Sequence, residues 1–390
     1  MKRIRVEDAQ PGQRVARTLY FPNGTAMLAV GAALSAAAIQ KLVQFGYRDI
    51  AVFEEGAGDV DCRDLVAEPA RAPMAKKLGV FFRQVRDVVG RAAAIPSGAD
   101  AAEITKRLGD PAVRQAIKSV RFVEAIAGPE LDAFFDGIVS EKDAPMVAGA
   151  PRTEASHAVD HAIAVAARAV VMGRALGWLP RDLREICVGG LLHDIGYLVL
   201  AEESERAPAG QQGHPVAGYH LLRADTGLSL LAAHCAYQHH ERHDGSGFPR
   251  KLIGPSSISG RDSTAPGTIH RYAVLMAIAD RFDLLVSGFP DGWAMQDHEA
   301  IATMRSEAGR ALHPEAFRVF CSLTPPYPIG TEMEVTGGEL AGCTGIVTSN
   351  SAAAIDRPVV RFLRRGGQPL AQPIEVDTAK QGVNARPRGG

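Results

Sequence analysis

Histidines and aspartates gather in one part of this sequence. Ten of the twelve histidines lie between His157 and His270, and the run 190–197 places His193 beside Asp194 at the end of an apolar stretch. A His–Asp pair buried in a helix costs free energy unless its polar groups find partners. A chain of nearly zero net charge has no solvation reason to crowd imidazoles, and metal binding is the usual reason. The dipeptide by itself is equally compatible with a hydrogen-bonded core histidine followed by a helix-ending aspartate.

Two further histidine pairs have spacings that suit a metal centre. His157 and His161 are four residues apart, so on a helix they project from one face and can reach the same ion. A solvated face is the alternative, but the Ala/Val pattern after His161 favours a helix that faces the core. His239 and His240 are adjacent, and neighbouring helical side chains point about 100° apart. The second pair therefore favours two different ions or a dinuclear centre.

Two more donors complete the set. His214 begins another helical segment, and Asp280 lies in an apolar helix predicted at 272–285, where a carboxylate is either paired or metal-bound. The candidate metal ligands are His157, His161, His193, Asp194, His214, His239, His240 and Asp280. This nitrogen and oxygen set suits iron, manganese or zinc and is too large for one tetrahedral zinc ion. Two ions about 3.5–4 Å apart would bind a phosphate and activate water, as in phosphoester hydrolysis.

The motifs resemble a known family in their residues and their order. Residues 193–196 read His-Asp-Ile-Gly, residues 239–249 read His-His-Glu-Arg-His-Asp-Gly-Ser-Gly-Phe-Pro, and residues 279–283 read Ala-Asp-Arg-Phe-Asp. With His214-Pro215 between them, they closely resemble the HD-GYP branch of the HD phosphohydrolases over residues 155–320. The resemblance implies a helical domain with two or three divalent ions, iron or manganese. It also implies hydrolysis of the bacterial second messenger cyclic di-GMP to pGpG and GMP.

The resemblance assigns a role to each position. Asp194 is the expected bridge between two metal ions. The other ligands of the two-metal shell would be His161, His193, His214, His239, His240 and Asp280. Members with three metals carry a glutamate one helical turn before the first histidine. This chain has His157 there, which could ligate a third ion.

Three departures from the family pattern concern the substrate rather than the metals. Tyr197 stands where the family commonly has a lysine that acts at the scissile phosphate, and tyrosine can donate a hydrogen bond but brings no fixed charge. We expect it to be catalytic. Phe248 replaces the tyrosine of the G-Y-P motif, and residues 283–292 lack two basic residues with which the family holds its substrate. The candidates to compensate in substrate binding are Arg261, Arg271 and His270.

The candidate metal ligands match the family pattern, whereas the substrate-binding residues differ from it, and this combination leaves several functions open. The first is a cyclic di-GMP phosphodiesterase, weakened because few groups replace the bidentate phosphate contacts of arginine. The alternative is a non-catalytic signalling protein that keeps the fold and the metals and binds partner proteins through the loops 254–267 or 288–292. A third is a general HD phosphohydrolase that acts on nucleotides.

The whole chain is expected to be mainly α. Residues 1–55 alternate short β-like runs with turns around one helix, which predicts a small α+β module. Residues 56–150 predict a helical connector or dimerisation surface rather than a ligand site, and hence a homodimer. Residues 151–323 carry the all-helical HD-type metal-binding domain. Residues 324–381 predict a small β-rich module, and residues 382–390 a disordered tail.

Bulk properties exclude several classes of protein. A net charge of −1 favours neither nucleic-acid nor membrane-surface binding. The five cysteines are scattered and form no C-x-x-C motif, which is typical of a reducing compartment. The most apolar window, residues 26–39, is too short for a bilayer core of about 30 Å. We therefore expect a cytoplasmic protein whose partners are cyclic di-GMP and signalling proteins.

Overall fold

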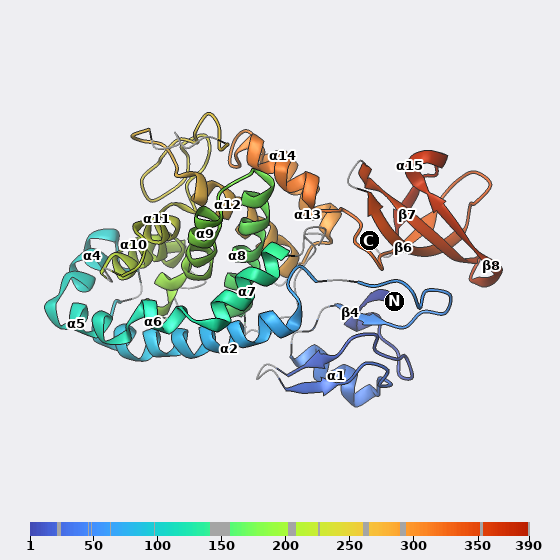
Figure 1. The fold of residues 1–390 in the computed structure, drawn as a ribbon, viewed down its shortest axis with the longest axis horizontal. Helices are drawn as coiled ribbons and strands as arrows, with labels where there is room; N and C mark the ends of the chain where they lie inside the picture. The colour runs from blue at the N-terminus through green and yellow to red at the C-terminus, as the bar shows by residue number, and fades with distance from the viewer. Residues whose placement is uncertain are drawn as a thin grey trace.

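The computed structural model describes residues 1–21, 25–45, 47, 49–62, 64–96, 98–140, 157–201, 208–224, 227–259, 265–288, 294–351 and 354–388. The chain is mainly helical and ends in a five-stranded sheet. Figure 1 shows most of the helices on one side of the molecule, with the N-terminal strands and α1, and the C-terminal sheet and α15, on the other. The prediction of a mainly α chain is confirmed at this level.

The N-terminal part holds short strands around one helix. Its elements are β1 (Lys2–Arg5), the 3-10 helix η1 (Val6–Asp8), β2 (Leu19–Tyr20), β3 (Ala26–Leu28), α1 (Ala36–Gln44) and β4 (Asp49–Val52). β1 pairs antiparallel with β4, and β2 with β3. α1 begins after Ser35, whose hydroxyl accepts a hydrogen bond from the amide of Ala38. Leu42 of α1 is buried, whereas Val43, expected on the same apolar face, is 57% exposed.

A series of helices follows. They are α2 (Glu68–Gln84), the π-helical turn η2 (Val85–Gly90), α3 (Arg91–Ala93), α4 (Ala101–Gly109), α5 (Pro111–Val120), α6 (Phe122–Ile126) and α7 (Pro129–Ser140). Apolar residues at helical spacing run through residues 117–126, from Ile117 to Ile126. The structure breaks this run at Arg121, which has a positive φ of 51° and separates α5 from α6. The break lets both short helices bury apolar side chains, among them Ile117 and Phe122.

The histidine-rich part is mainly helical, with irregular backbone over residues 239–259 and 265–270. Its elements are α8 (His157–Ala175), α9 (Pro180–Leu192), the 3-10 helix η3 (Ile195–Val199), α10 (Pro208–Ala224), α11 (Leu230–Gln238), α12 (Arg271–Ser287), α13 (Asp297–Glu307) and α14 (Pro314–Leu323). Two glycines allow close packing at its centre. A Cβ on Gly190 would lie 2.6 Å from the Cα of Ala166, and a Cβ on Gly196 would overlap the carbonyl oxygen of His214. These contacts bring the His193-Asp194 segment against α8 and α10.

The C-terminal part is an antiparallel sheet in the order β8-β7-β6-β5-β9. Its elements are β5 (Glu332–Val335), β6 (Cys343–Ser351), β7 (Ala354–Arg365), β8 (Gln368–Asp377), α15 (Thr378–Gln381) and β9 (Ala385–Pro387). The prediction that residues 382–390 form a disordered tail is wrong for β9, because Ala385 to Pro387 pair with β5. A three-residue strand carries too weak a pattern to be read from sequence without its partner.

The two ends of the chain are packed together. The N-terminal amine of Met1 donates hydrogen bonds to the carbonyl oxygens of Ala57 and Val60, at 2.6 and 3.0 Å. Lys2 forms an ion pair with Glu332 of β5, at 2.8 Å. These contacts join the N-terminal strands to the C-terminal sheet, which the sequence predicted as separate modules. Among the described helices, none is both long enough and apolar enough to cross a membrane.

Candidate metal centre

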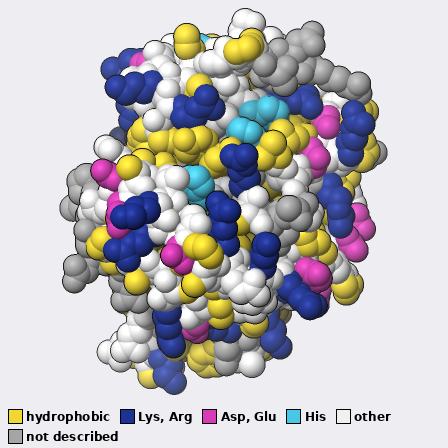
Figure 2. All heavy atoms as spheres, turned by 90° about the vertical axis from the view of Figure 1, so that its left-hand side faces the viewer, with side chains coloured by type: hydrophobic (Ala, Val, Ile, Leu, Met, Phe, Trp, Pro, Cys, Tyr) yellow, Lys and Arg dark blue, Asp and Glu magenta, His cyan; other side chains and the backbone are white. Residues whose placement is uncertain are grey.

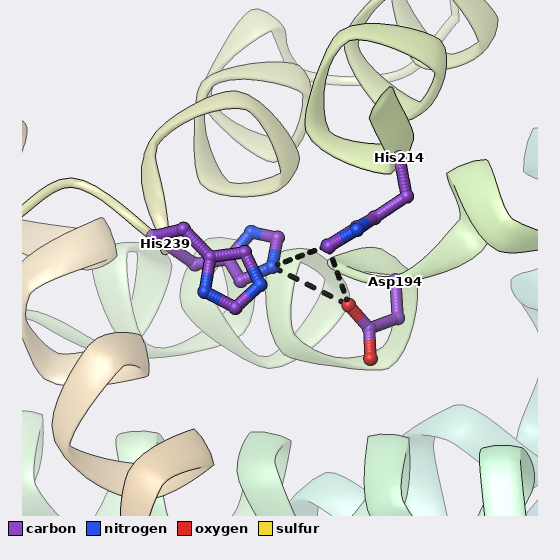
Figure 3. A group of neighbouring side chains, drawn as sticks. Asp194, His214 and His239 are labelled. Atoms are coloured by element: carbon purple, nitrogen blue, oxygen red, sulfur yellow. Dashed lines mark hydrogen bonds and ion pairs between the residues drawn. The ribbon is translucent and has the colours of Figure 1, made fainter. Parts of the chain in front are cut away.

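Helices α8 to α12 bring the predicted ligands to one place. His161 lies on α8, His193 and Asp194 follow α9, and His214 lies on α10. His239 and His240 follow α11, and Asp280 lies on α12. Figure 3 shows Asp194, His214 and His239 pointing toward one another from separate segments. The structure therefore gathers residues that are up to 119 positions apart in the sequence, from His161 to Asp280.

Asp194 lies between two pairs of histidines. Its Oδ2 is 3.4 Å from the Nε2 of His161 and 3.4 Å from the Nε2 of His193. Its Oδ1 is 3.3 Å from the Nε2 of His214 and 3.3 Å from the Nε2 of His239. Each carboxylate oxygen thus faces its own pair of ring nitrogens. This is the geometry required of a carboxylate that bridges two ions.

Within each pair the ring nitrogens point at each other. The Nε2 atoms of His161 and His193 are 3.2 Å apart, and those of His214 and His239 are 3.1 Å apart. In two rings the Nδ1 atom faces a backbone carbonyl oxygen. His193 Nδ1 lies 2.7 Å from the carbonyl oxygen of Gly190, and His239 Nδ1 lies 2.9 Å from that of Ala236.

A carbonyl oxygen can only accept, so each of these two Nδ1 atoms must carry the proton. In the neutral ring the Nε2 atom then presents its lone pair to the site. Lone pairs that converge with an ionised carboxylate suit a divalent cation, and imidazole with carboxylate suits iron, manganese or zinc. The residues present therefore fit a metal centre with two ions. Of the described residues, two groups have ligand atoms within 4.8 Å of one another, and both contain Asp194.

The charges in the half that contains His161 differ from those in the other half. Burial lowers the pKa of His161, but hydrogen bonds to Asp194, Asp280 and Asp283 outweigh it and hold this pKa well above the ordinary imidazole range. The pKa of His193 is also raised, because the charge of Asp194 outweighs the effect of burial. A metal ion that enters this half must displace a proton.

In the other half, the pKa values of His214 and His240 are shifted toward the neutral form. Burial lowers the pKa of His214, although Asp194 opposes the shift. Burial and the neighbouring rings of His239 and His214 hold the pKa of His240 well below the ordinary range. Asp194 itself is kept ionised, because the surrounding imidazoles outweigh burial and hold its pKa well below the usual carboxyl range.

Two buried residues that the sequence did not identify hold His161 in place. The Nδ1 of His161 lies 2.6 Å from Oδ2 of Asp283, whose other oxygen accepts a hydrogen bond from Arg168 at 2.7 Å. All three side chains are buried. A carboxylate on the far nitrogen fixes the orientation of a ligand histidine and increases its basicity. The available signal was an isolated arginine in an Ala/Val-rich helix, two turns after His161.

The remaining predicted ligands occupy different positions. Oδ1 of Asp280 lies 3.2 Å from Nε2 of His161, so Asp280 borders the first half. His240 belongs to the group of Asp194, His214 and His239. His157 is buried and its ring stacks on His161, with centroids 5.5 Å apart, but it belongs to neither group. A third ion at His157 stays a prediction.

The residues predicted to contact the substrate also lie in different places. Tyr197 is half-buried, and its ring stacks on His214 with centroids 3.8 Å apart, so it borders the second half. Arg271 is buried at the first position of α12, nine residues before Asp280. There its guanidinium pairs with Asp182 at 2.9 Å and covers the ring of Trp178. These contacts contradict a substrate-binding role for Arg271. Arg261 lies outside the described residues.

Two histidines outside the two groups cap helices. His313 caps α14, and His270 caps α12 by accepting a hydrogen bond from the amide of Tyr272. His220 contacts the hydroxyl of Thr105 at 3.1 Å. On the face shown in Figure 2, histidine side chains reach the surface beside a band of hydrophobic side chains and several lysine or arginine side chains.

The loop after His240 is held by carboxylates. Glu241 is buried and accepts hydrogen bonds from the amides of Arg250 and Leu252, at 2.7 and 2.8 Å. It therefore orders the loop that follows the ligand histidines. Asp244 accepts a hydrogen bond from the amide of Ser246 at 2.9 Å and so holds the turn at Gly245.

Residues 158–285 match the HD domain family. This part of the chain is therefore similar to HD domains. The match spans Asp194, His214, His239 and Asp280, which lie on the elements that build the centre. The resemblance to HD-GYP proteins is confirmed by relatives of this HD domain.

Three curated relatives are similar to the chain over different lengths. It is 25% identical over 364 residues, 90% of this chain and 82% of the relative, to cyclic di-GMP phosphodiesterase PA4108 of Pseudomonas aeruginosa. It is 29% identical over 155 residues, 37% of each protein, to the cyclic di-GMP phosphodiesterase response regulator RpfG of Xanthomonas campestris. It is 30% identical over 136 residues, 32% of this chain and 23% of the relative, to the 3'3'-cGAMP-specific phosphodiesterase 2 of Vibrio cholerae.

Proposed function

We propose that the HD domain is a metal-dependent phosphodiesterase that hydrolyses cyclic di-GMP. The observation that carries the proposal is the position of Asp194, whose two oxygens face separate histidine pairs. Relatives named as cyclic di-GMP phosphodiesterases support the choice of substrate. We assign the activity to the predicted domain 151–323, which contains every candidate ligand.

Two divalent ions in such a centre supply positive charge for the phosphate and lower the pKa of a bound water. His161, His193 and Asp280 would hold one ion, and His214, His239 and His240 the other, with Asp194 between them. Iron or manganese is the proposed metal, as the resemblance to HD-GYP proteins implies, and the nitrogen and oxygen donors suit both. His157 would serve a third ion if one binds.

The chain's own residues supply orientation and a proton donor. Asp283 keeps the Nε2 of His161 aimed at the centre, and backbone carbonyls do the same for His193 and His239. The ring of Tyr197 lies against His214, and we propose that its hydroxyl donates a hydrogen bond to a phosphate oxygen or to the leaving oxygen. Phe248 stacks on His240, with centroids 5.0 Å apart, and forms an apolar wall beside the second half.

Two other functions remain as outcomes of the test. A signalling protein that binds metal without turnover has less support, because the relatives are named as phosphodiesterases. A related substrate, 3'3'-cGAMP, is suggested by the name of the Vibrio cholerae relative. We also propose a cytoplasmic protein with signalling partners and a homodimeric state. All five cysteines are free, as is usual in a reducing compartment.

The test is metal content together with turnover, on protein purified without oxygen. We expect two or three ions per chain and conversion of cyclic di-GMP to pGpG and GMP, followed by chromatography. The Asp194→Ala variant should lose both the bound metal and the hydrolysis of cyclic di-GMP. The wild-type protein should hydrolyse 3'3'-cGAMP more slowly than cyclic di-GMP. A full metal load with no hydrolysis of either substrate would instead support the non-catalytic alternative. Protein that binds no metal would remove the basis of the proposal.

A further inference from the structure

A large cleft lies away from the metal centre, between the N-terminal strands and α2. Its volume is about 1580 Å³, which exceeds the roughly 300–1,000 Å³ of common small-molecule sites. One wall includes Arg3, Tyr20 and Phe21, and the other is formed by α2 and includes Lys76 and Arg83. In Figure 1 the N-terminal strands lie beside one end of α2. No candidate metal ligand lines this cleft.

Most charges along the cleft are neutralised within it. Arg17 pairs with Asp64 at 2.5 Å, and Lys77 pairs with Glu130 at 2.8 Å. Arg71 pairs with two carboxylates, as described below. Three cations in the cleft lining form no ion pair or side-chain hydrogen bond with the described residues: Arg3, Lys76 and Arg83. Among the acidic residues of the lining, the same is true of Asp49 alone. The cleft therefore has an excess of positive charge that an anion would neutralise.

The opposite wall offers aromatic rings held in place. Tyr20 and Phe21 are half-buried. The hydroxyl of Tyr47 donates to the carbonyl oxygen of Tyr20 at 2.5 Å and accepts from its amide at 2.8 Å. The ring of Phe21 meets the ring of Phe45 edge to face, with centroids 5.7 Å apart. Aromatic side chains combined with cations are the groups on which nucleotide bases and phosphates bind.

We propose that this cleft binds a nucleotide, with its phosphates at Lys76 and Arg83 and its base against Tyr20 or Phe21. The sequence predicted a connector or dimerisation surface for residues 56–150 rather than a ligand site. Helical periodicity could not reveal the cleft, because its second wall comes from residues about 60 positions earlier in the chain, Tyr20 against Lys76 to Arg83.

A contact in the same cleft reaches the metal-binding helix. Arg71 of α2 donates to Glu68 at 2.7 Å and to Oδ1 of Asp160 at 2.8 Å. Asp160 lies on α8, directly before the ligand His161. Because Arg71 and Asp160 both line the cleft, a ligand that shifts α2 would act on the start of α8. We infer that the nucleotide regulates the metal centre. This regulation rests on the proposed function, whereas nucleotide binding in the cleft is independent of the proposed function.

Binding is tested by calorimetry on the full-length Asp194→Ala protein with GTP and with GMP as probes. We expect saturable binding of at least one probe and at least a tenfold loss of affinity in Lys76→Glu/Arg83→Glu. Both side chains are exposed, so the fold should be kept, and Lys76→Gln/Arg83→Gln provides a milder second variant. The matched control is Arg114→Glu/Lys118→Glu, with the same charge change at exposed positions of α5 outside the cleft.

An equal loss of affinity in the control variant would show general electrostatic attraction and would overturn the proposed site. The absence of binding by both probes would also overturn it.

The coupling between the cleft and the metal centre is tested by the affinity for GMP in metal-free and Mn²⁺-loaded wild-type protein, with free Mn²⁺ fixed by a metal buffer. Coupling between sites is reciprocal and changes affinity by about 5–150-fold. We expect such a change, and its loss in Arg71→Met. An unchanged affinity would overturn the regulation.

These readouts are binding constants, so they separate the two proposals. Nucleotide binding in the cleft without any hydrolysis of cyclic di-GMP would leave the cleft standing and remove the proposed function. Hydrolysis without nucleotide binding to the Asp194→Ala protein would do the reverse.

Discussion

The two halves of the metal centre are built differently although they share Asp194. In the first half, carboxylates surround His161: Asp280 at its Nε2 and Asp283 at its Nδ1. In the second half, the support comes from a backbone carbonyl at His239 and from the aromatic rings of Tyr197 and Phe248. The first half therefore carries the charged groups that hold an ion tightly. The second half carries the walls that a substrate would meet.

This difference predicts separate effects of mutation. Changes around the first half should act mainly on stability and metal affinity. Changes around the second half should act mainly on turnover while the metal content is kept.

The largest expected effect is in Asp283→Ala. It removes the buried ion pair with Arg168, and breaking a buried pair typically costs about 3–5 kcal/mol of stability. It also removes the partner of His161, and loss of such a partner typically weakens metal binding about 10–100-fold. The measurements are urea denaturation of the metal-free protein and Mn²⁺ titration.

The double variant Arg168→Met/Asp283→Leu separates these two contributions. Apolar replacements of a buried ion pair are often neutral for stability. We expect the unfolding free energy to recover in this variant while the metal affinity stays low. If the metal affinity recovers too, the partner of His161 has no role beyond folding.

The next prediction uses protonation in the metal-free protein. Carboxylate contacts outweigh burial and raise the pKa of His161 well above its ordinary value of 6.5, whereas burial lowers that of His240 well below it. At pH 6.5 we expect His161 to be protonated and His240 neutral in ¹⁵N spectra of the ring nitrogens. Metal binding by the first half should then release a proton and strengthen as the pH rises. Identical titration of the two rings would contradict the comparison.

The ligands could be predicted from sequence because most of the signals are local. His239 and His240 are neighbours, His193 adjoins Asp194, and short motifs around them carry the resemblance. The support of His161 could not be predicted, because Arg168 and His161 meet Asp283 across 115 and 122 residues. The same reason explains the error at Arg271, whose partner Asp182 is 89 residues away.

The fold, like the site, could be predicted from sequence only where the contacts are local. The helices of the HD domain follow from apolar runs and caps, but the joining of the two chain ends depends on contacts such as Lys2 with Glu332. A pattern within a few residues contains no information about such partners. The predicted boundaries near residues 55, 150 and 323 remain predictions.

In the second half, Tyr197→Phe keeps the ring on His214 and removes the hydroxyl. If the hydroxyl donates a hydrogen bond during hydrolysis, kcat should fall about 10–100-fold with little change in KM, because general acid groups contribute up to about 10²–10⁴-fold. Metal content should not change. Tyr197→Lys tests whether a fixed charge at this position raises kcat. An unchanged kcat in Tyr197→Phe would show that the ring acts by packing alone.

The smallest expected effect is in Phe248→Tyr. The ring can keep its stack on His240, so the added hydroxyl should change KM by no more than about threefold, the size of one weak hydrogen bond. Phe248→Ala is the comparison, because it removes the wall and should raise KM more, with both ions still bound. Steady-state kinetics and metal content measure both variants. If Phe248→Ala instead loses an ion, the aromatic side chain holds the ligand His240 in place, and the two halves of the centre differ less than their contacts suggest.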